Sequence, residues 1–279
     1  GGKFQKGAYQ TSGGLHGVGA AAVNALSEWM EVTVRREGSV WYQRYQRGIP
    51  DAPVKKIGKI GKGESTGTTT RFMFDKIIFE KDATYRYETL VNRFREMAFV
   101  TSGVFMKLRD ERPSTPREMS FYFEGGVKSF VRYLNRNRKP IHDPVYDQKE
   151  VEGIDVEVSL QYTEGVAISE FAFANTIHTP DGGTHLTGVR TAVTRVINSY
   201  ARKNNFLKEK DNNFSSDDTR EGLTTVISVK HPDPQFESQT KVKLMNAEVA
   251  GIVASVTADA FNLYLEENPR EAKKIIERC

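Results

Sequence analysis

The segment from Ser12 to Val23 combines the residue types of a phosphate-binding loop. Its glycines are Gly13, Gly14, Gly17 and Gly19. A backbone without Cβ atoms lets its N–H groups approach an anion closely. Good helix formers follow and run to Leu26, so a helix is expected there, and its unpaired N–H donors and dipole favour a bound phosphate. The pattern predicts a site for a phosphorylated ligand.

The glycine spacing fits neither of two well-known nucleotide motifs. A P-loop needs G-x-x-x-x-G-K-[S/T], and the dinucleotide fingerprint needs G-x-G-x-x-G after a strand. The loop here reads G-x-x-G-x-G, with no strand close before it. A flexible loop that packs a helix tightly against a sheet would use the same glycines, so spacing alone leaves both interpretations open.

Other side chains that could do chemistry are scattered. The histidines His142, His178, His185 and His231 lack an H-x-x-x-H spacing or a cysteine partner, so no zinc site is expected. The one cysteine, Cys279, cannot form a disulfide within the chain, which favours a reducing, cytoplasmic environment. The formal net charge of +4 permits a nucleic-acid partner without requiring one. No apolar run approaches the length of about 18 residues that a membrane-spanning helix needs.

Hydrophobic periodicity predicts a mixture of helices and strands. Residues 87–98 place apolar side chains at helical spacing, and residues 67–74 are rich in β-branched and aromatic types. Further strands are expected at 31–36, 39–47, 104–109, 120–123, 156–162, 170–177 and 223–229. Further helices are expected at 127–135, after Gly182-Gly183-Thr184, and around 249–263. A lysine- and glycine-rich connection (55–65) and a polar loop (208–218) are expected between them, with two α+β domains divided near Gly125.

Several motifs together resemble one family, the ATPase subunits of bacterial type IIA topoisomerases. The glycine loop, with Tyr9 before it and Asn24 and Ser27 after it, is similar to the ATP lid of that family. Similar segments continue at 66–68, 95–99, 108–110, 124–128, 181–185 (Asp-Gly-Gly-Thr-His), 218–222, 234–241 (with Gln-Thr-Lys) and 267–269. The resemblance covers nearly the whole chain and is closer to the gyrase type than to the topoisomerase IV type.

The resemblance implies a fold and a domain order. Residues 1–124 would form the C-terminal portion of a Bergerat-type (GHKL) ATP-binding domain, including the lid, and residues 125–279 an α+β transducer domain. The chain opens Gly1-Gly2-Lys3-Phe4 without an initiator methionine, so we expect it to start inside a longer protein. In this family the glutamate that activates water and the asparagine that holds Mg²⁺ lie upstream of the lid. No metal ligand is therefore assigned here, and these residues alone are not expected to hydrolyse ATP.

The resemblance also assigns site residues by position. Residues expected to bind ATP are Lys3, Tyr9, Gly14, Leu15, His16, Gly17, Val18, Gly19, Arg36 and Thr68. The lid would hold the phosphates, while Arg36 and Thr68 would line the adenine side, where coumarin-type inhibitors bind in this family. Gln239 and Lys241 would act in catalysis at the γ-phosphate, where a fixed ammonium stabilises developing charge. Taken alone, Arg36 and Lys241 would be interpreted as solvated surface side chains.

The implied function is that of an enzyme, an ATP-hydrolysing topoisomerase subunit that couples ATP-driven dimerisation to DNA strand passage and negative supercoiling. The expected cofactors are ATP and Mg²⁺. The expected partners are a second copy of the chain, the gyrase A protein in a heterotetramer, double-stranded DNA and coumarin-type inhibitors, in the bacterial cytoplasm at the nucleoid. Two alternatives stay open: a decatenating topoisomerase IV subunit, and a nucleotide-free DNA clamp or scaffold. Arg190, Arg195 and Arg202 would face the DNA, although a charged helix face is usually only solvated.

Overall fold

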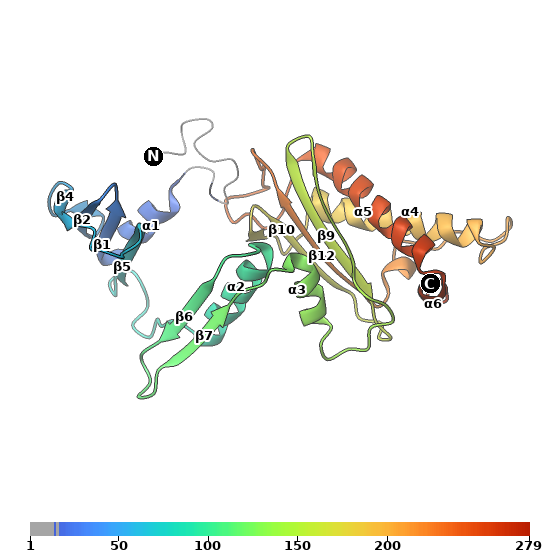
Figure 1. Ribbon diagram of the computed structural model, residues 1–279, viewed down its shortest axis with the longest axis horizontal. Helices are drawn as coiled ribbons and strands as arrows, with labels where there is room; N and C mark the ends of the chain where they lie inside the picture. The colour runs from blue at the N-terminus through green and yellow to red at the C-terminus, as the bar shows by residue number, and fades with distance from the viewer. Residues whose placement is uncertain (1–13, 15–16) are drawn as a thin grey trace. The chain divides into compact units, whose positions relative to one another are not determined.

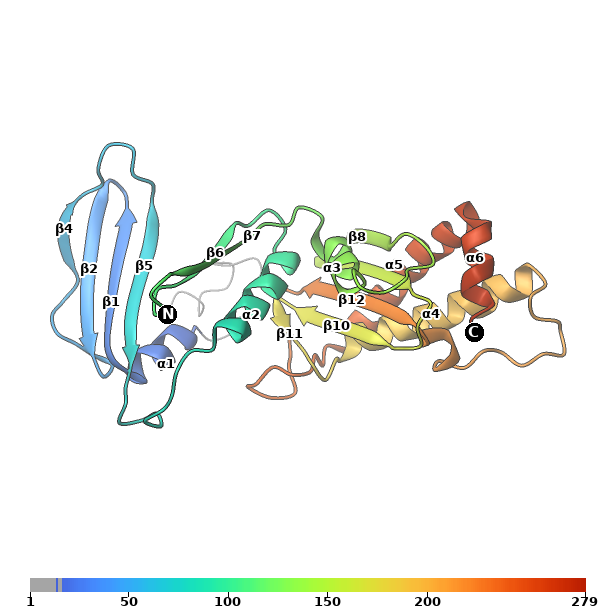
Figure 2. The same cartoon turned by 90° about the horizontal axis from the view of Figure 1, so that it is seen from below.

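The computed structural model describes Gly14 and residues 17–279. These residues form two compact units, the first ending at Arg86 and the second beginning at Tyr87. Each unit has its own five-stranded sheet and at least one helix (Figures 1 and 2), and the expected α+β class is confirmed. The expected boundary near Gly125 lies inside the second unit, because helices on either side of it share one core. The domain division at that residue stays a prediction.

The first unit is an antiparallel sheet preceded by a short helix. Its elements are α1 (Gly19–Ala25), β1 (Ser27–Arg36), β2 (Ser39–Gln46), β3 (Ile49–Pro50), β4 (Lys55–Lys59) and β5 (Gly67–Phe74). β1 lies between β2 and β5, and β3 and β4 both pair with β2. Glu37 and Gly38, with φ of 52° and 71°, make the predicted hairpin turn. The segment expected to be a connection at 55–65 instead begins with a strand, fully exposed at an edge where lysines are tolerated.

The second unit combines a sheet covered by helices with a two-stranded ribbon. Its elements are α2 (Tyr87–Val100), β6 (Met106–Asp110), β7 (Arg117–Phe121), α3 (Gly126–Leu134), β8 (Val145–Val151), β9 (Ile154–Tyr162), β10 (Ser169–Ala174), β11 (Ile177–His178), α4 (Thr184–Lys203), the 3₁₀ turn η2 (Asp218–Arg220), β12 (Leu223–Lys230), α5 (Ala247–Glu267) and α6 (Pro269–Ile276). The sheet order is β11-β10-β12-β9-β8, in which only β10 and β12 run parallel. No described helix of the chain is long and apolar enough to cross a membrane.

Alternate side chains of this sheet enter two cores. On β12, Leu223, Ile227 and Val229 pack with α4 and α5, whereas Val226 packs on the other face with α2 and α3. The rings of Phe99 on α2 and Phe130 on α3 stack there at a centroid distance of 4.6 Å. Because both faces are covered, β12 is buried along almost its whole length.

Three segments of the second unit differ from expectation. The strand expected at 170–177 is two strands, because Asn175 and Thr176 take φ of 48° and 69° and turn the chain. A strand, β8, occupies residues between 135 and 156, where no helix or strand is expected from the sequence. The closing helix is followed by α6, which begins at Pro269, a residue suited to the first helical position because it has no N–H to lose there.

Candidate functional site

The described part of the glycine loop has an open backbone. The predicted site residues Lys3, Tyr9, Leu15 and His16 lie outside the described residues. Gly17 has φ of 66°, in the left-handed region that favours glycine. α1 begins at Gly19 with no side-chain cap and no acidic residue in its first turn, and a Cβ on Gly19 would meet nothing within 4 Å. This backbone fits the approach of an anion, and the roles of Gly14, Gly17, Val18 and Gly19 stay predictions.

The sheet of the first unit places Arg36 and Thr68 on the same face. Val34 pairs with Thr68 on β5 and with Trp41 on β2, and residues directly opposite in an antiparallel sheet point to one face. Arg36 follows Val34 by two positions and so points the same way. Its side chain is 75% exposed and pairs with Glu37 at 3.1 Å between Nε and Oε1. Such exposed pairs are weak, so the guanidinium can exchange this partner for a ligand.

Gln239 and Lys241 lie in the loop between β12 and α5, in the second unit. Residues 238–241 form a tight turn, in which the N–H of Lys241 donates to the carbonyl of Ser238 at 3.0 Å and Lys241 takes φ of 58°. The hydroxyl oxygens of Ser238 and Thr240 lie 2.6 Å apart inside the turn. Gln239 is exposed, whereas Lys241 is half-buried. The turn thus presents Gln239 and holds the backbone of Lys241.

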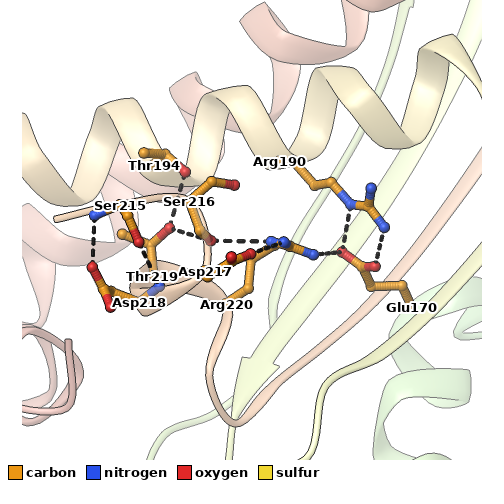
Figure 3. A network of polar contacts seen from close by, with 9 residues as sticks. All are labelled: Glu170, Arg190, Thr194, Ser215, Ser216, Asp217, Asp218, Thr219 and Arg220. Atoms are coloured by element: carbon orange, nitrogen blue, oxygen red, sulfur yellow. Dashed lines mark hydrogen bonds and ion pairs between the residues drawn. The ribbon is translucent and has the colours of Figure 1, made fainter.

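The three arginines predicted to face DNA lie on α4 but have different partners. Arg190 donates to both carboxylate oxygens of Glu170, at 2.9 Å from Nε and 2.5 Å from Nη2. Arg220 also points toward Glu170 (Figure 3), with Nη1 3.6 Å from Oε1. The hydrogen bonds to Glu170 raise the pKa of Arg190. Sequence reasoning missed this pair, because no motif signals a contact between β10 and α4.

Arg202 also has hydrogen-bond partners within the fold, whereas Arg195 has none in the described part of the chain. Arg202 donates to the Asn213 side chain at 2.9 Å and to the carbonyls of Lys208 and Asp211, so it holds the polar loop against the helix. Arg195 is exposed and has no ion-pair or hydrogen-bond partner within the described part of the chain. It lines a groove of about 670 Å³ between α4 and residues 213–216, together with Arg190. The structure thus singles out Arg195 as the arginine of the three with no competing contact.

The described histidines have structural surroundings. His142 Nε2 accepts the N–H of Tyr162 at 2.8 Å, and burial lowers its pKa. His185 is fully buried, which lowers its pKa to about 4. In residues 17–279, no group of three or more histidine, cysteine or acidic side chains is placed to hold a metal ion.

Known proteins resemble this chain over its whole length. A family model described as DNA gyrase B matches residues 126–279. The DNA gyrase B protein of Bacillus mycoides is 50% identical over 279 residues, all of this chain and 68% of that protein. The 43K ATPase domain of Thermus thermophilus gyrase B, in complex with an aminocoumarin, is 37% identical with a TM-score of 0.78, over 94% of this chain and 70% of that chain.

A solved topoisomerase IV is also similar. The ATP-binding domain of topoisomerase IV from Francisella tularensis, in complex with a small-molecule inhibitor, is 30% identical with a TM-score of 0.79, over 96% of this chain and 72% of that chain. The match to the gyrase relative is closer in identity and extends over the full chain. The chain therefore belongs to the DNA gyrase B family and corresponds to the ATPase region of that protein.

Proposed function

We propose that this chain binds ATP and, within the complete gyrase B protein, couples ATP hydrolysis and dimerisation to DNA strand passage and negative supercoiling. Family membership supports the reaction. The observation that carries the assignment to particular residues is the tight turn 238–241, which holds Lys241 in a fixed backbone conformation next to the exposed Gln239. A preorganised ammonium stabilises the charge that gathers on a transferred phosphoryl group without having to reorganise during the reaction.

The remaining site residues are proposed from their positions in the family motif. Lys3, Gly14, Leu15, His16, Gly17, Val18 and Gly19 would hold the ATP phosphates, and Tyr9 the nucleoside. The open backbone from Gly17 to Gly19 supports this role. Arg36 and Thr68 would line the adenine side, and their common face on the sheet supports a joint role. Mg²⁺ would neutralise the phosphates, through ligands other than the residues assigned here.

The partners are also proposals. They are a second copy of the chain, the gyrase A protein, double-stranded DNA and a coumarin-type inhibitor. The inhibitor is included because the Thermus thermophilus structure holds an aminocoumarin. A bacterial cytoplasmic location follows from the same assignment. The groove beside Arg195 favours a DNA contact. The same contact would also serve the alternative function, a nucleotide-free DNA clamp. A salt-dependent DNA affinity that does not respond to ATP would favour the clamp.

The test is Lys241→Ala in the complete gyrase B protein. Loss of one charged donor at a phosphoryl-transfer site costs on the order of 10²–10³ in rate, so ATP hydrolysis should fall by about that factor. ADP has no γ-phosphate, so its affinity should change little. Lys243→Ala is the matched control, because Lys243 lies in the same loop and is paired with Glu237 at 3.3 Å. Near-normal turnover in Lys241→Ala would contradict the proposed role.

A further inference from the structure

The loop that carries Lys241 is a narrow hairpin whose two sides bind each other. The N–H of Glu237 donates to the carbonyl of Lys243 at 3.1 Å, and the N–H of Met245 donates to the carbonyl of Gln235 at 2.8 Å. The turn 238–241 is the tip of this hairpin. Side chains at the tip are exposed from 237 to 240, so core packing does not fix their position.

The glycine turn before α4 binds the returning side of the hairpin. The N–H of Asp181 donates to the carbonyl of Val242 at 3.0 Å. Leu244 donates to the carbonyl of Gly182 and accepts from the N–H of Thr184, both at 3.1 Å. The bond from Asp181 is made to Val242, the residue that directly follows Lys241. The Asp-Gly-Gly-Thr motif, far away in the sequence, therefore holds the backbone that follows the lysine.

Gly183 makes this contact possible. It has φ of 132°, and a Cβ there would lie 2.3 Å from the carbonyl oxygen and 2.5 Å from the nitrogen of Leu244. Neither backbone atom can move aside without shifting the hairpin. A residue with a side chain is thus excluded both by conformation and by space. Leu244 itself is fully buried, so the contact joins the hairpin to the core.

A second clamp closes the base of the hairpin. Asn246, which is buried, accepts the N–H of Gln235 at 2.7 Å and donates to the carbonyl of Asp233 at 3.2 Å. His231 accepts the N–H of Asp233 on Nδ1 at 2.9 Å, and its Nε2 lies 2.9 Å from the carboxylate of Glu248. The base and the returning side are therefore fixed, and the tip is held through them.

We propose that Gly183 is a positioning residue for Lys241, acting through the backbone of residues 242–244. The inference rests on the proposed role of Lys241 in ATP hydrolysis. A Cβ at Gly183 would displace Leu244 and with it the lysine ammonium. A small displacement of a catalytic group costs up to about 10²-fold in rate, so the effect should be visible in turnover even where the fold is retained.

The experiment is a double-mutant cycle in the complete gyrase B protein. ATP turnover and ADP affinity are measured for Gly183→Ala, Lys241→Ala and the double variant. Gly183→Ala should lower turnover by about tenfold or more and leave ADP affinity unchanged. In the Lys241→Ala background it should have a much smaller effect, because the main residue through which it acts is gone and only Gln239, on the same turn, remains to be displaced. Gly251→Ala on α5, where a Cβ would meet nothing within 4 Å, is the matched control and should turn over normally.

The possible results distinguish a failure of the positioning role of Gly183 from a failure of the proposed role of Lys241 in hydrolysis. If Gly183→Ala lowers turnover equally in both backgrounds, its role is general and the positioning proposal is overturned. If Lys241→Ala itself keeps normal turnover, the proposed function fails, and the positioning role fails with it. Should Gly183→Ala not fold, Asn246→Ala decides the question, because it loosens the base of the same hairpin. The same lack of additivity with Lys241→Ala is then expected, and additive losses would again overturn the proposal.

Discussion

Arg190 and Glu170 form a bidentate ion pair between α4 and β10, with donor–acceptor distances of 2.9 and 2.5 Å. The Glu170 side chain is 13% exposed and also faces Arg220, so two guanidinium groups enclose one carboxylate. Glu170 therefore neutralises much of the Arg190 charge within the fold. Arg195, five residues further along the same helix, has no such partner in the described structure. The two arginines should not contribute equally to a DNA contact.

Arg195→Ala in the complete gyrase B protein should weaken DNA binding more than Arg190→Ala. An unpaired arginine that neutralises one phosphate contributes about 0.9 to the slope of log affinity against log salt. The Arg195 variant should therefore show a shallower salt dependence, measured by titrating DNA at several salt concentrations. Basal ATP hydrolysis should be unchanged. Equal losses of DNA affinity in the two variants would contradict the distinction.

Arg190→Ala should act mainly on stability. It leaves a largely buried carboxylate with only the more distant Arg220, at 3.6 Å, and the loss of hydrogen bonds to a charged group costs about 1.5–3 kcal/mol. Glu170→Gln added to Arg190→Ala should recover part of that loss in a denaturant titration, because the neutral amide tolerates the missing cation. If the double variant is no more stable than Arg190→Ala, the carboxylate is not the source of the loss.

Sequence patterns identified the strands and helices whose side chains alternate or repeat clearly. The apolar residues of α2 recur at helical spacing, and β12 is a short run of mostly apolar and β-branched residues, so both elements are predicted. β4 was missed because all five of its residues are exposed, so pairing with β2 through the backbone leaves no hydrophobic pattern. β8 is an edge strand with mostly polar residues, and it was missed for the same reason.

The candidate site was predictable only in part. The resemblance selected Arg36 and Thr68, and the strand register explains why they share a face. The same motifs gave no sign that the glycines at 182 and 183 hold the Lys241 loop, because that contact depends on long-range packing. Likewise, Arg190, Arg195 and Arg202 look equivalent as a charge pattern. Their partners come from β10 and the 208–213 loop, which helix periodicity cannot reveal.

Gly188 and Gly251, on the packed helices α4 and α5, should respond oppositely to the same substitution. A Cβ on Gly188 would lie 2.5 Å from the carbonyl oxygen of Ala250, so Gly188→Ala should destabilise the protein by about 1–3 kcal/mol through overpacking. A Cβ on Gly251 would meet nothing within 4 Å, so Gly251→Ala should stabilise its helix by about 0.5–1 kcal/mol. Denaturant unfolding of both variants measures the difference. Two shifts of the same sign would contradict the packing of α4 on α5.

His185 should make stability depend on pH. Burial lowers its pKa to about 4 in the folded protein, against about 6.5 when unfolded. The unfolded state therefore binds the proton first as pH falls. The contribution of neutral, buried His185 to the free energy of unfolding is complete above about pH 6.5. It is lost progressively down to about pH 4, by up to about 3 kcal/mol. His185→Gln cannot titrate, so its stability relative to the parent protein should rise between about pH 7 and pH 4.5 in denaturant titrations. Parallel pH curves for the two proteins would contradict the assignment.

Arg36 should matter more for inhibitor binding than for turnover. Its guanidinium is exposed and only weakly paired, so Arg36→Ala should leave stability nearly unchanged. Loss of a hydrogen bond from a charged donor costs about 1.5–3 kcal/mol, so affinity for a coumarin-type inhibitor should fall on the order of 10- to 100-fold, measured by calorimetry on the complete gyrase B protein. ATP turnover should fall less, because the γ-phosphate is assigned to Gln239 and Lys241. Arg35→Ala is the matched control: this neighbour points to the opposite face and donates to the carbonyl of Ser65 at 3.2 Å. An equal loss of inhibitor affinity in both variants would show that strand charge, and not the face shared with Thr68, determines binding.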